Sequence, residues 1–178
     1  MTVNNMELPD KSVLNKDETH YDYIDSYQSD FFDKNNNISP TEIGKAFFSS
    51  GPKWVAKLFA LRNKIVRIFG LKTSGSVTNR QKQLDSFKCE PGEQLGLFKV
   101  FSKTNNEVVL GEDDKHLNFR VSLLLDKLPN ETDKKTLTIT TTVVFNNWFG
   151  RLYFLPVRPF HKLIVPAMLK GFIKELEK

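Results

Sequence analysis

Three side chains in the last third of the sequence have the chemistry to hold a polar ligand group. Arg151, Tyr153 and His161 lie where a loop is expected to lead into the last helix. An arginine there can turn inward to bind an anion or a carbonyl group, and a tyrosine or histidine can hydrogen-bond or transfer a proton. A structural interpretation also stays open. In it, Arg151 pairs with Glu112 or Asp114, and His161 is a neutral, locally satisfied side chain.

The densest group of ionisable residues is Glu112-Asp113-Asp114-Lys115-His116. In an extended segment Asp114 and His116 share one side, but two ligands do not make a zinc or iron site, which needs about three protein ligands. No His-x-x-x-His, His-Glu-x-x-His or Cys-x-x-Cys spacing occurs in the chain. We therefore expect no metal site, and we interpret the group as a charged turn between strands.

The sequence offers little for covalent or cofactor chemistry. It has no Gly-x-Ser-x-Gly nucleophile turn, and its single cysteine, Cys89, is next to Glu90, whose charge favours a raised thiol pKa. It also lacks the Gly-x-Gly-x-x-Gly and Walker sequences that hold nucleotide phosphates. We expect an unreactive Cys89 and no cofactor.

Six basic residues and no acid lie on and just after an expected helix over residues 53–70. Four of them share the face opposite its apolar stripe: Lys53, Lys57, Lys64 and Arg67. Such a face can contact an anionic membrane surface, bind nucleic acid, or be solvated beside the acidic first 42 residues. Because no nucleic-acid motif accompanies these residues, a membrane surface is favoured over nucleic acid as a partner.

Composition bounds the class of protein. The 178 residues are 39% apolar and 26% charged and include fifteen phenylalanines, enough for one soluble domain with a real core. One cysteine excludes an internal disulfide, and no apolar run approaches the roughly 20 residues that span a bilayer. We expect a cytoplasmic protein with a loosely ordered lead-in over residues 1–20 and a single domain over residues 21–178.

The first half of the chain predicts one strand and two helices. Residues 20–27 alternate like a strand with an aromatic face. Ser39-Pro40-Thr41-Glu42 is typical of a helix start with Ser39 as N-cap, so a helix is expected from there to about Ser50. Apolar spacings of three and four predict the second helix over 53–70. Residues 73–92 are expected to form a loop, with a short strand near residues 84–88.

The second half changes to a period of two. Alternate apolar residues predict half-buried strands over 117–125 and 137–145, and residues 95–102 with 107–111 predict a hairpin. Short polar connections favour antiparallel pairing. A last helix is expected from Pro159 to the C-terminus, bent at Pro166, with its apolar side on the sheet.

This order of elements is similar to the helix-grip architecture of the START-like superfamily, which includes plant pollen allergens and polyketide cyclases. Five segments resemble a mostly bacterial family of uncharacterised function in that superfamily, over roughly residues 20–170: Asp22-Tyr23-Ile24-Asp25-Ser26, Gly111-Glu112-Asp113-Asp114-Lys115-His116-Leu117, Phe119-Arg120-Val121-Ser122, Gly150-Arg151-Leu152-Tyr153-Phe154 and Pro159-Phe160-His161. The resemblance implies an α+β fold with a twisted antiparallel sheet wrapped on a long C-terminal helix and two short helices after the first strand. Five or six of the seven strands of that architecture are evident.

The resemblance also implies a cavity between sheet and helix, used elsewhere in the superfamily for lipids, sterols, aromatic compounds or polyketides. On this analogy we predict a protein that binds a small hydrophobic or amphipathic molecule there. The expected ligand-binding residues are Phe98, Phe119, Ile139, Phe145, Arg151, Tyr153, Phe160, His161, Ile164 and Met168, and Thr141 is a further polar group able to face inward. No catalytic residue is assigned. Two other functions stay open: a cyclase- or dehydratase-like enzyme using the same cavity, and a non-enzymatic interaction module with a filled core.

Overall fold

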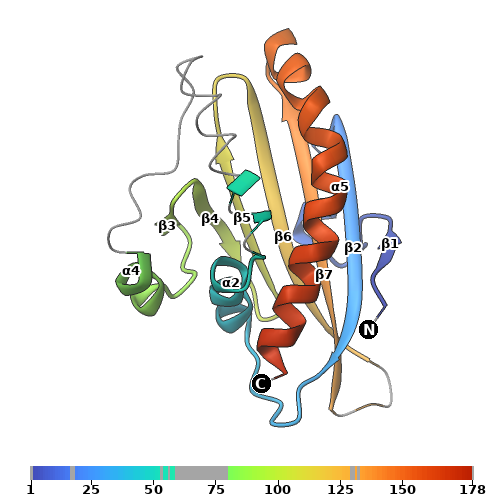
Figure 1. Cartoon of the computed structure of the whole chain (residues 1–178), viewed down its shortest axis with the longest axis vertical. Coiled ribbons are helices and arrows are strands. Elements are labelled where there is room, and N and C mark those ends of the chain that lie inside the picture. The colour runs from blue at the N-terminus through green and yellow to red at the C-terminus, as the bar shows by residue number, and fades with distance from the viewer. Residues whose placement is uncertain are drawn as a thin grey trace.

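The computed structural model describes residues 2–16, 19–52, 54–55, 57–58, 80–128, 131 and 133–177. Within these ranges the chain forms one seven-stranded antiparallel sheet with the strand order β1-β2-β7-β6-β5-β4-β3. Figure 1 shows the long helix α5, in orange to red, lying across the face of β2 and β7. This arrangement confirms the predicted α+β class, an antiparallel sheet packed against a long C-terminal helix.

The strands are β1 (Asn4–Met6), β2 (Tyr23–Phe32), β3 (Gln94–Leu95), β4 (Phe98–Lys103), β5 (Glu107–Asp113), β6 (Leu117–Lys127) and β7 (Lys134–Phe145). The helices are α1 (Val13–Lys16), α2 (Pro40–Ser49), α4 (Arg80–Ser86) and α5 (Trp148–Leu176). The sheet has more strands than the sequence predicted because β1 and β3 contain only three and two residues, too few to display a period. Residues 1–20, which carried no predicted element, supply β1 and α1.

The two short helices differ in how well they were predicted. Ser39 caps α2 by accepting a hydrogen bond from the Glu42 amide, and its hydroxyl donates to the Glu42 carboxylate, which confirms the predicted helix start. The short strand expected near 84–88 is wrong, because residues 80–86 form α4, which turns Leu84 into the core beside Phe87. The expected helix over 53–70 lies mostly outside the described residues.

Helix α5 begins at Trp148 rather than at Pro159, so the predicted start is wrong. Asn147 is its N-cap, and the side-chain oxygen accepts a hydrogen bond from the Gly150 amide at 3.1 Å. Three prolines lie inside the helix, and each lacks the amide that would bond to the carbonyl four residues earlier. Those carbonyls belong to residues whose side chains are exposed, so water can satisfy them: Leu152, Leu155 and Lys162.

Two glycines allow α5 to approach the rest of the chain closely at both of its ends. A Cβ at Gly150 would lie 2.1 Å from the His116 carbonyl oxygen, in the connection between β5 and β6. A Cβ at Gly171 would lie 2.4 Å from the carbonyl oxygen of Ser50, the C-cap of α2. Neither distance is possible for a real side chain, so only glycine permits this placement of α5.

The face of the sheet under α5 follows the predicted alternation. Val121, Leu123, Leu137, Ile139 and Val143 are buried on it, and Leu117, Phe119 and Phe145 are half-buried. Strand β2 adds Tyr23, Tyr27 and Phe31 to the same face, and α5 covers it with Val165, Leu169, Phe172 and Ile173. The register of β6 on β7, with Phe119 opposite Val143, confirms the predicted strand pattern.

The opposite face of the sheet also contains buried polar residues. The Glu107 carboxylate on β5 is 1% exposed and accepts hydrogen bonds from the Ser12 and Ser122 hydroxyls and from the Val13 amide. These contacts hold the N-terminal segment against the sheet, although its sequence shows no period. The buried carboxylate is satisfied by three donors, as a charge in that environment requires.

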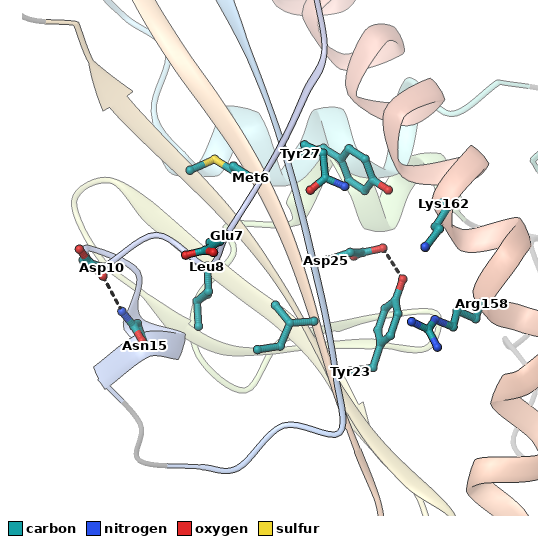
Figure 2. Close-up of a pocket in the computed structure, with 12 residues that line it drawn as sticks. Met6, Glu7, Leu8, Asp10, Asn15, Tyr23, Asp25, Tyr27, Arg158 and Lys162 are labelled. Carbon is teal, nitrogen blue, oxygen red and sulfur yellow. Dashed lines mark hydrogen bonds between the residues drawn. The ribbon is translucent and has the colours of Figure 1, made fainter.

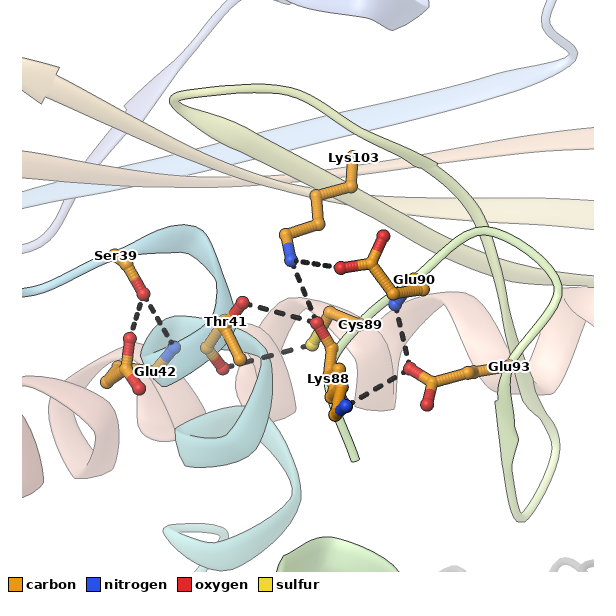
Figure 3. A network of polar contacts seen from close by, with 8 residues as sticks. All are labelled: Ser39, Thr41, Glu42, Lys88, Cys89, Glu90, Glu93 and Lys103. Atoms are coloured by element: carbon orange, nitrogen blue, oxygen red, sulfur yellow. Dashed lines mark hydrogen bonds and ion pairs between the residues drawn. The ribbon is translucent and has the colours of Figure 1, made fainter. Parts of the chain in front are cut away.

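A polar network connects the start of α2 to the segment before β3 (Figure 3). The Lys103 ammonium binds the Glu90 carboxylate at 2.8 Å and the Lys88 carbonyl at 2.9 Å, and the Thr41 hydroxyl donates to that same carbonyl. Cys89 lies between them, fully buried, with its thiol facing the Thr41 carbonyl. Burial raises the pKa of this thiol to about 12, so it is protonated at neutral pH.

A buried ion pair connects β7 to the chain that follows β2. The Lys135 ammonium and the Asp33 carboxylate are 2.5 Å apart, with side chains 4% and 2% exposed. Asp33 also accepts hydrogen bonds from the Asn37 and Ile38 amides. Burial alone would raise the pKa of Asp33, but Lys135 and the two amides lower it below its ordinary value.

We expect Lys135→Gln to lower the free energy of unfolding by about 3 to 5 kcal/mol, because it leaves the Asp33 charge buried without its partner. The matched control is Lys134→Gln, which removes a partly exposed pair with Asp30 at 3.6 Å and should cost less than about 1 kcal/mol. Urea unfolding at neutral pH measures both values. Equal losses in the two variants would contradict a special role for the buried pair.

The same pair gives stability a defined pH dependence. Because the pKa of Asp33 is lowered in the folded protein, its contribution is complete above its ordinary pKa of 3.8 and is lost as the pH falls through the lower folded value. The difference in stability between the wild type and Lys135→Gln should therefore shrink in acid. Urea unfolding at a series of acidic pH values tests this, and a constant difference would speak against it.

Cys89 should react with a thiol reagent only after unfolding. Because its thiol is buried and protonated, we expect its rate in the native protein to be at least about a hundredfold below that of the urea-unfolded chain. Absorbance of released thionitrobenzoate follows both reactions. Rapid labelling of the native protein, with the circular dichroism spectrum unchanged, would contradict the placement of this residue.

Candidate functional site

A cluster of three polar side chains lies between β2 and α5. The Tyr23 hydroxyl donates to Asp25 Oδ2 at 2.7 Å, and His161 Nδ1 is 2.9 Å from the same oxygen. The Asp25 side chain is 6% exposed and that of His161 is 20% exposed. The two rings and the carboxylate thus form a largely buried hydrogen-bonded group whose members come from opposite ends of the chain.

This cluster belongs to a short polar row that extends from β2 to β7. Asp25 on β2 is the cross-strand neighbour of Thr141 on β7, so the two side chains share the face that α5 covers. Both keep one buried oxygen without a hydrogen-bond partner among the described residues, Asp25 Oδ1 and Thr141 Oγ1. Buried acceptors and hydroxyls in that state are costly and rare in proteins. The row therefore has unused hydrogen-bonding capacity inside the core.

The apolar core divides at this row. On one side, Tyr27 and Ile139 belong to the larger cluster of buried side chains. On the other, Tyr23 and Val143 form a smaller cluster with Phe154 of α5. The polar row thus replaces apolar contacts at the place where the two clusters would otherwise merge.

Burial and the Asp25 charge control the ionisation of the two neighbouring tyrosines. The pKa of Tyr23 is raised by burial first and then by its hydrogen bond to Asp25 and the negative charge there, and Arg158 opposes this in part. The pKa of Tyr27 is raised by burial and by the same charge. Both hydroxyls therefore stay protonated and able to donate at neutral pH.

An open pocket of about 590 Å³ lies beside this cluster, around the edge of the sheet where β1 pairs with β2. Figure 2 shows Arg158 and Lys162 reaching from α5 toward Tyr23 and Asp25. Arg158 is 5.5 Å from the centre of the Tyr23 ring. The remaining lining comes from the N-terminal segment and β2: Asn5, Met6, Glu7, Leu8, Asp10, Asn15, Ile24 and Tyr27. The pocket thus has a mixed lining, with a few apolar side chains, the buried carboxylate of Asp25, the exposed carboxylates of Glu7 and Asp10, and two cations.

The polar residues predicted for a ligand site are not all together. His161 lies inside α5, not in its first turn, and it contacts Asp25 as described. Arg151 is 67% exposed, pairs with Asp22 at 3.1 Å, and lies over the Phe145 ring. Tyr153 is half-buried, one turn before Val157 of the smaller cluster. Only His161 and Thr141 therefore join the polar row.

The predicted apolar lining lies along the boundary between sheet and helix. Phe98, Phe119, Phe145, Ile164 and Met168 are half-buried, Ile139 is buried, and Phe160 is 51% exposed. The Phe98 and Phe119 rings meet edge to face, with centres 5.6 Å apart. No ligand contact of these residues is tested by the structure, so their role stays a prediction.

Tyr23, Asp25 and Arg158 were missed as site residues. The signal for Asp25 was present, because it occupies an inward position in the alternation Tyr21, Tyr23, Asp25, Tyr27. An acid at a position that the period assigns to the core indicates a buried charge with partners elsewhere. Those partners could not be named because His161 lies more than a hundred residues later in the chain.

Comparison with known proteins places the chain in a family. Residues 19–168 match a family described as "Protein of unknown function (DUF2867)". The chain belongs to this family. No curated protein shows significant sequence similarity to the chain. Since the family has no assigned reaction, it transfers no role to Asp25 or His161.

One solved structure is similar to the chain, that of a conserved protein from Geobacillus kaustophilus. The two are 14% identical over 86% of this chain and 95% of the other, with a TM-score of 0.39. A likeness of this size supports no statement about a ligand.

Two features of the chain bear on contact with a membrane: its helices and the predicted basic face. No helix among the described residues is both long enough and apolar enough to cross a bilayer. Of the four basic residues expected to contact a membrane surface, Lys57 is exposed, and Lys53, Lys64 and Arg67 lie outside the described residues. That contact stays a prediction.

Removal of the unpartnered Thr141 hydroxyl should affect stability differently from removal of the bonded hydroxyl of Thr140. Thr141→Val removes a buried hydroxyl that bonds to nothing described, so we expect unchanged or higher stability, by up to about 1 kcal/mol. Thr140→Val is the matched control on the opposite face, where the hydroxyl bonds to Ser26 Oγ at 2.7 Å, and should cost about 1 to 3 kcal/mol. Urea unfolding compares them, and a larger loss for Thr141→Val would disprove the unpartnered state.

Proposed function

We propose that the protein binds a small amphipathic molecule between the sheet and α5, with the polar end of the molecule at Asp25. The observation that carries the proposal is the unpartnered Oδ1 of Asp25, a buried carboxylate oxygen of a residue that lines an open pocket. A ligand that supplies a hydrogen-bond donor there removes the cost of leaving that oxygen without a partner.

The chemistry of the site limits which polar groups the ligand can carry at that end. Asp25 Oδ2 already accepts from Tyr23 and lies within hydrogen-bond distance of His161, so the free oxygen selects a donor such as a hydroxyl or an amine. Arg158 and Lys162 line the same pocket as the exposed acids Glu7 and Asp10, and these two cations favour an anionic or carbonyl group close to that donor. The polar end thus carries a donor and an acceptor side by side.

The apolar part of the ligand would follow the boundary between sheet and helix. The half-buried state of Phe119, Ile164 and Met168 supports this, because the wall of an accessible site needs apolar surface that packing has not fully covered. The resemblance of the sequence to the START-like superfamily supports the same location, as an analogy of architecture. Lipids, sterols and aromatic compounds are the ligand classes that this analogy suggests.

The first experiment is native mass spectrometry of the protein purified from cells, which detects a retained small molecule. A naphthalene sulfonate dye then serves as a defined probe in fluorescence titration. We expect dye binding in the wild type, displacement by the retained molecule, and a roughly ten- to hundredfold weaker affinity of that molecule in Asp25→Asn. The matched control Asp126→Asn changes an acid that pairs with Lys11 and should bind as the wild type does.

Absence of a retained molecule together with unchanged fluorescence and thermal stability in the presence of fatty acids, sterols and dye would reject the proposal. In that case the interaction module with a filled core becomes the better interpretation. Phe119→Ala separates the two further. In a filled core it should cost about 3 to 5 kcal/mol and create no binding.

A second function, proton transfer catalysed in the same site, is favoured by the contact between Asp25 and His161. A histidine held at one ring nitrogen by a carboxylate presents the other nitrogen as an acid or a base. No described residue bonds to Nε2 of His161, so that atom is available to a substrate. This arrangement suits a cyclase- or dehydratase-like reaction.

Substitution of His161 distinguishes a binder from an enzyme. If the protein is a binder, His161→Gln and Tyr153→Phe should change ligand affinity by no more than about 1 kcal/mol. If it is an enzyme, His161→Gln should leave affinity nearly unchanged and lower turnover by roughly a hundredfold or more. We expect the first result. Turnover of the retained molecule that His161→Gln abolishes would establish the second.

A further inference from the structure

The outward side of α5 carries an exposed apolar ridge. Trp148, Leu152, Leu155 and Leu163 are 73%, 54%, 66% and 64% exposed, and Pro159 is exposed between them. Their spacings of four, three, four and four place them on one face of the helix, opposite the residues that enter the core. At 1.5 Å per residue the ridge is about 22 Å long. An apolar surface of this kind is unusual on a folded domain unless something covers it.

The excess of positive charge on α5 indicates which kind of surface could cover the ridge. Helix α5 has five cations, Arg151, Arg158, Lys162, Lys170 and Lys174, and one acid, Glu175, next to its last residue. Arg151 pairs with Asp22, and Arg158 and Lys162 line the pocket beside β2, whereas Lys170 continues the ridge face one turn beyond Pro166. A helix that combines exposed tryptophan and leucine with an excess of cations over acids is typical of one that lies in the interface of an anionic membrane.

We propose that the outward face of α5 docks on an anionic lipid membrane surface, with the ridge inserted at the level of the headgroups. The proposal does not rest on the pocket at Asp25. It also concerns a different surface from the basic residues Lys53, Lys57, Lys64 and Arg67.

Two features of α5 favour a membrane surface over other arrangements. A second copy of the chain packed ridge to ridge would bring the five cations of one α5 beside those of the other, with one acid in each helix, Glu175, to offset them. The carbonyls of Leu152, Leu155 and Lys162, left without amide donors by the prolines, need water or headgroups, so they suit the interface and not the bilayer interior.

The test uses the full chain and two kinds of vesicle, one of phosphatidylcholine alone and one with phosphatidylserine added at about one part in four. The Trp54→Phe variant leaves Trp148 as the single tryptophan. We expect sedimentation with the anionic vesicles, a blue shift of Trp148 fluorescence on binding, and weaker binding as salt is raised from about 0.1 M to about 1 M.

Two sets of variants separate apolar insertion from charge. Leu152→Ser, Leu155→Ser and Leu163→Ser combined should weaken vesicle binding by about tenfold or more, while Phe32→Ser, which changes an exposed side chain on β2, should not. Lys170→Gln with Lys174→Gln should weaken binding more than the charge-matched pair Lys82→Gln with Lys127→Gln. Circular dichroism and thermal unfolding establish that each variant is folded.

Three results would overturn the proposal. They are absence of binding to anionic vesicles, equal binding by the triple serine variant, and equal binding to vesicles of phosphatidylcholine alone. Self-association of the wild type that the triple variant abolishes would also overturn it, and would assign the ridge to a contact between copies. None of these results bears on dye binding at Asp25, so the two proposals fail separately.

Discussion

The close approach of α5 to the rest of the chain is the constraint on which the other features depend. At one end its backbone contacts the connection between β5 and β6 through Gly150, and at the other it contacts the end of α2 through Gly171. The helix between these points has no freedom to move away from the sheet without losing both contacts. The distance between His161 and Asp25, the division of the core and the outward direction of the ridge all follow from that placement.

The polar row lowers the stability of the core but provides hydrogen-bonding groups that an apolar core would lack. An apolar residue at position 25 would merge the two core clusters, and it would remove a carboxylate that must stay buried with one oxygen unpartnered. Elsewhere in the same protein, buried acids are fully satisfied, as Glu107 is by three donors and Asp33 by Lys135 and two amides. This contrast is what supports the proposal that a ligand supplies the missing partner of Asp25.

The sequence predicts well what local spacing determines. The alternation of β6 and β7 and the capping residues of α2 are properties of neighbouring positions, and both are confirmed. The predicted start of α5 is wrong because proline is common at the first helical position, whereas here Pro159 lies inside a helix that begins after the Asn147 cap. The pairs Asp25 with His161 and Arg151 with Asp22 join residues more than a hundred positions apart, and no local pattern contains them.

The position of β7 between β2 and β6 has a consequence for the order of folding. Strand β2, near the N-terminus, pairs with β7 and not with any strand made earlier except the short β1. During synthesis β2 therefore cannot pair with β7 until most of the chain has been made. Its aromatic face is covered only when α5 leaves the ribosome. A domain with such distant pairings folds after its synthesis is nearly complete, and its nascent chain exposes Tyr23, Tyr27 and Phe31 for most of that time. Chaperones that bind aromatic segments would have this strand available in every newly made copy.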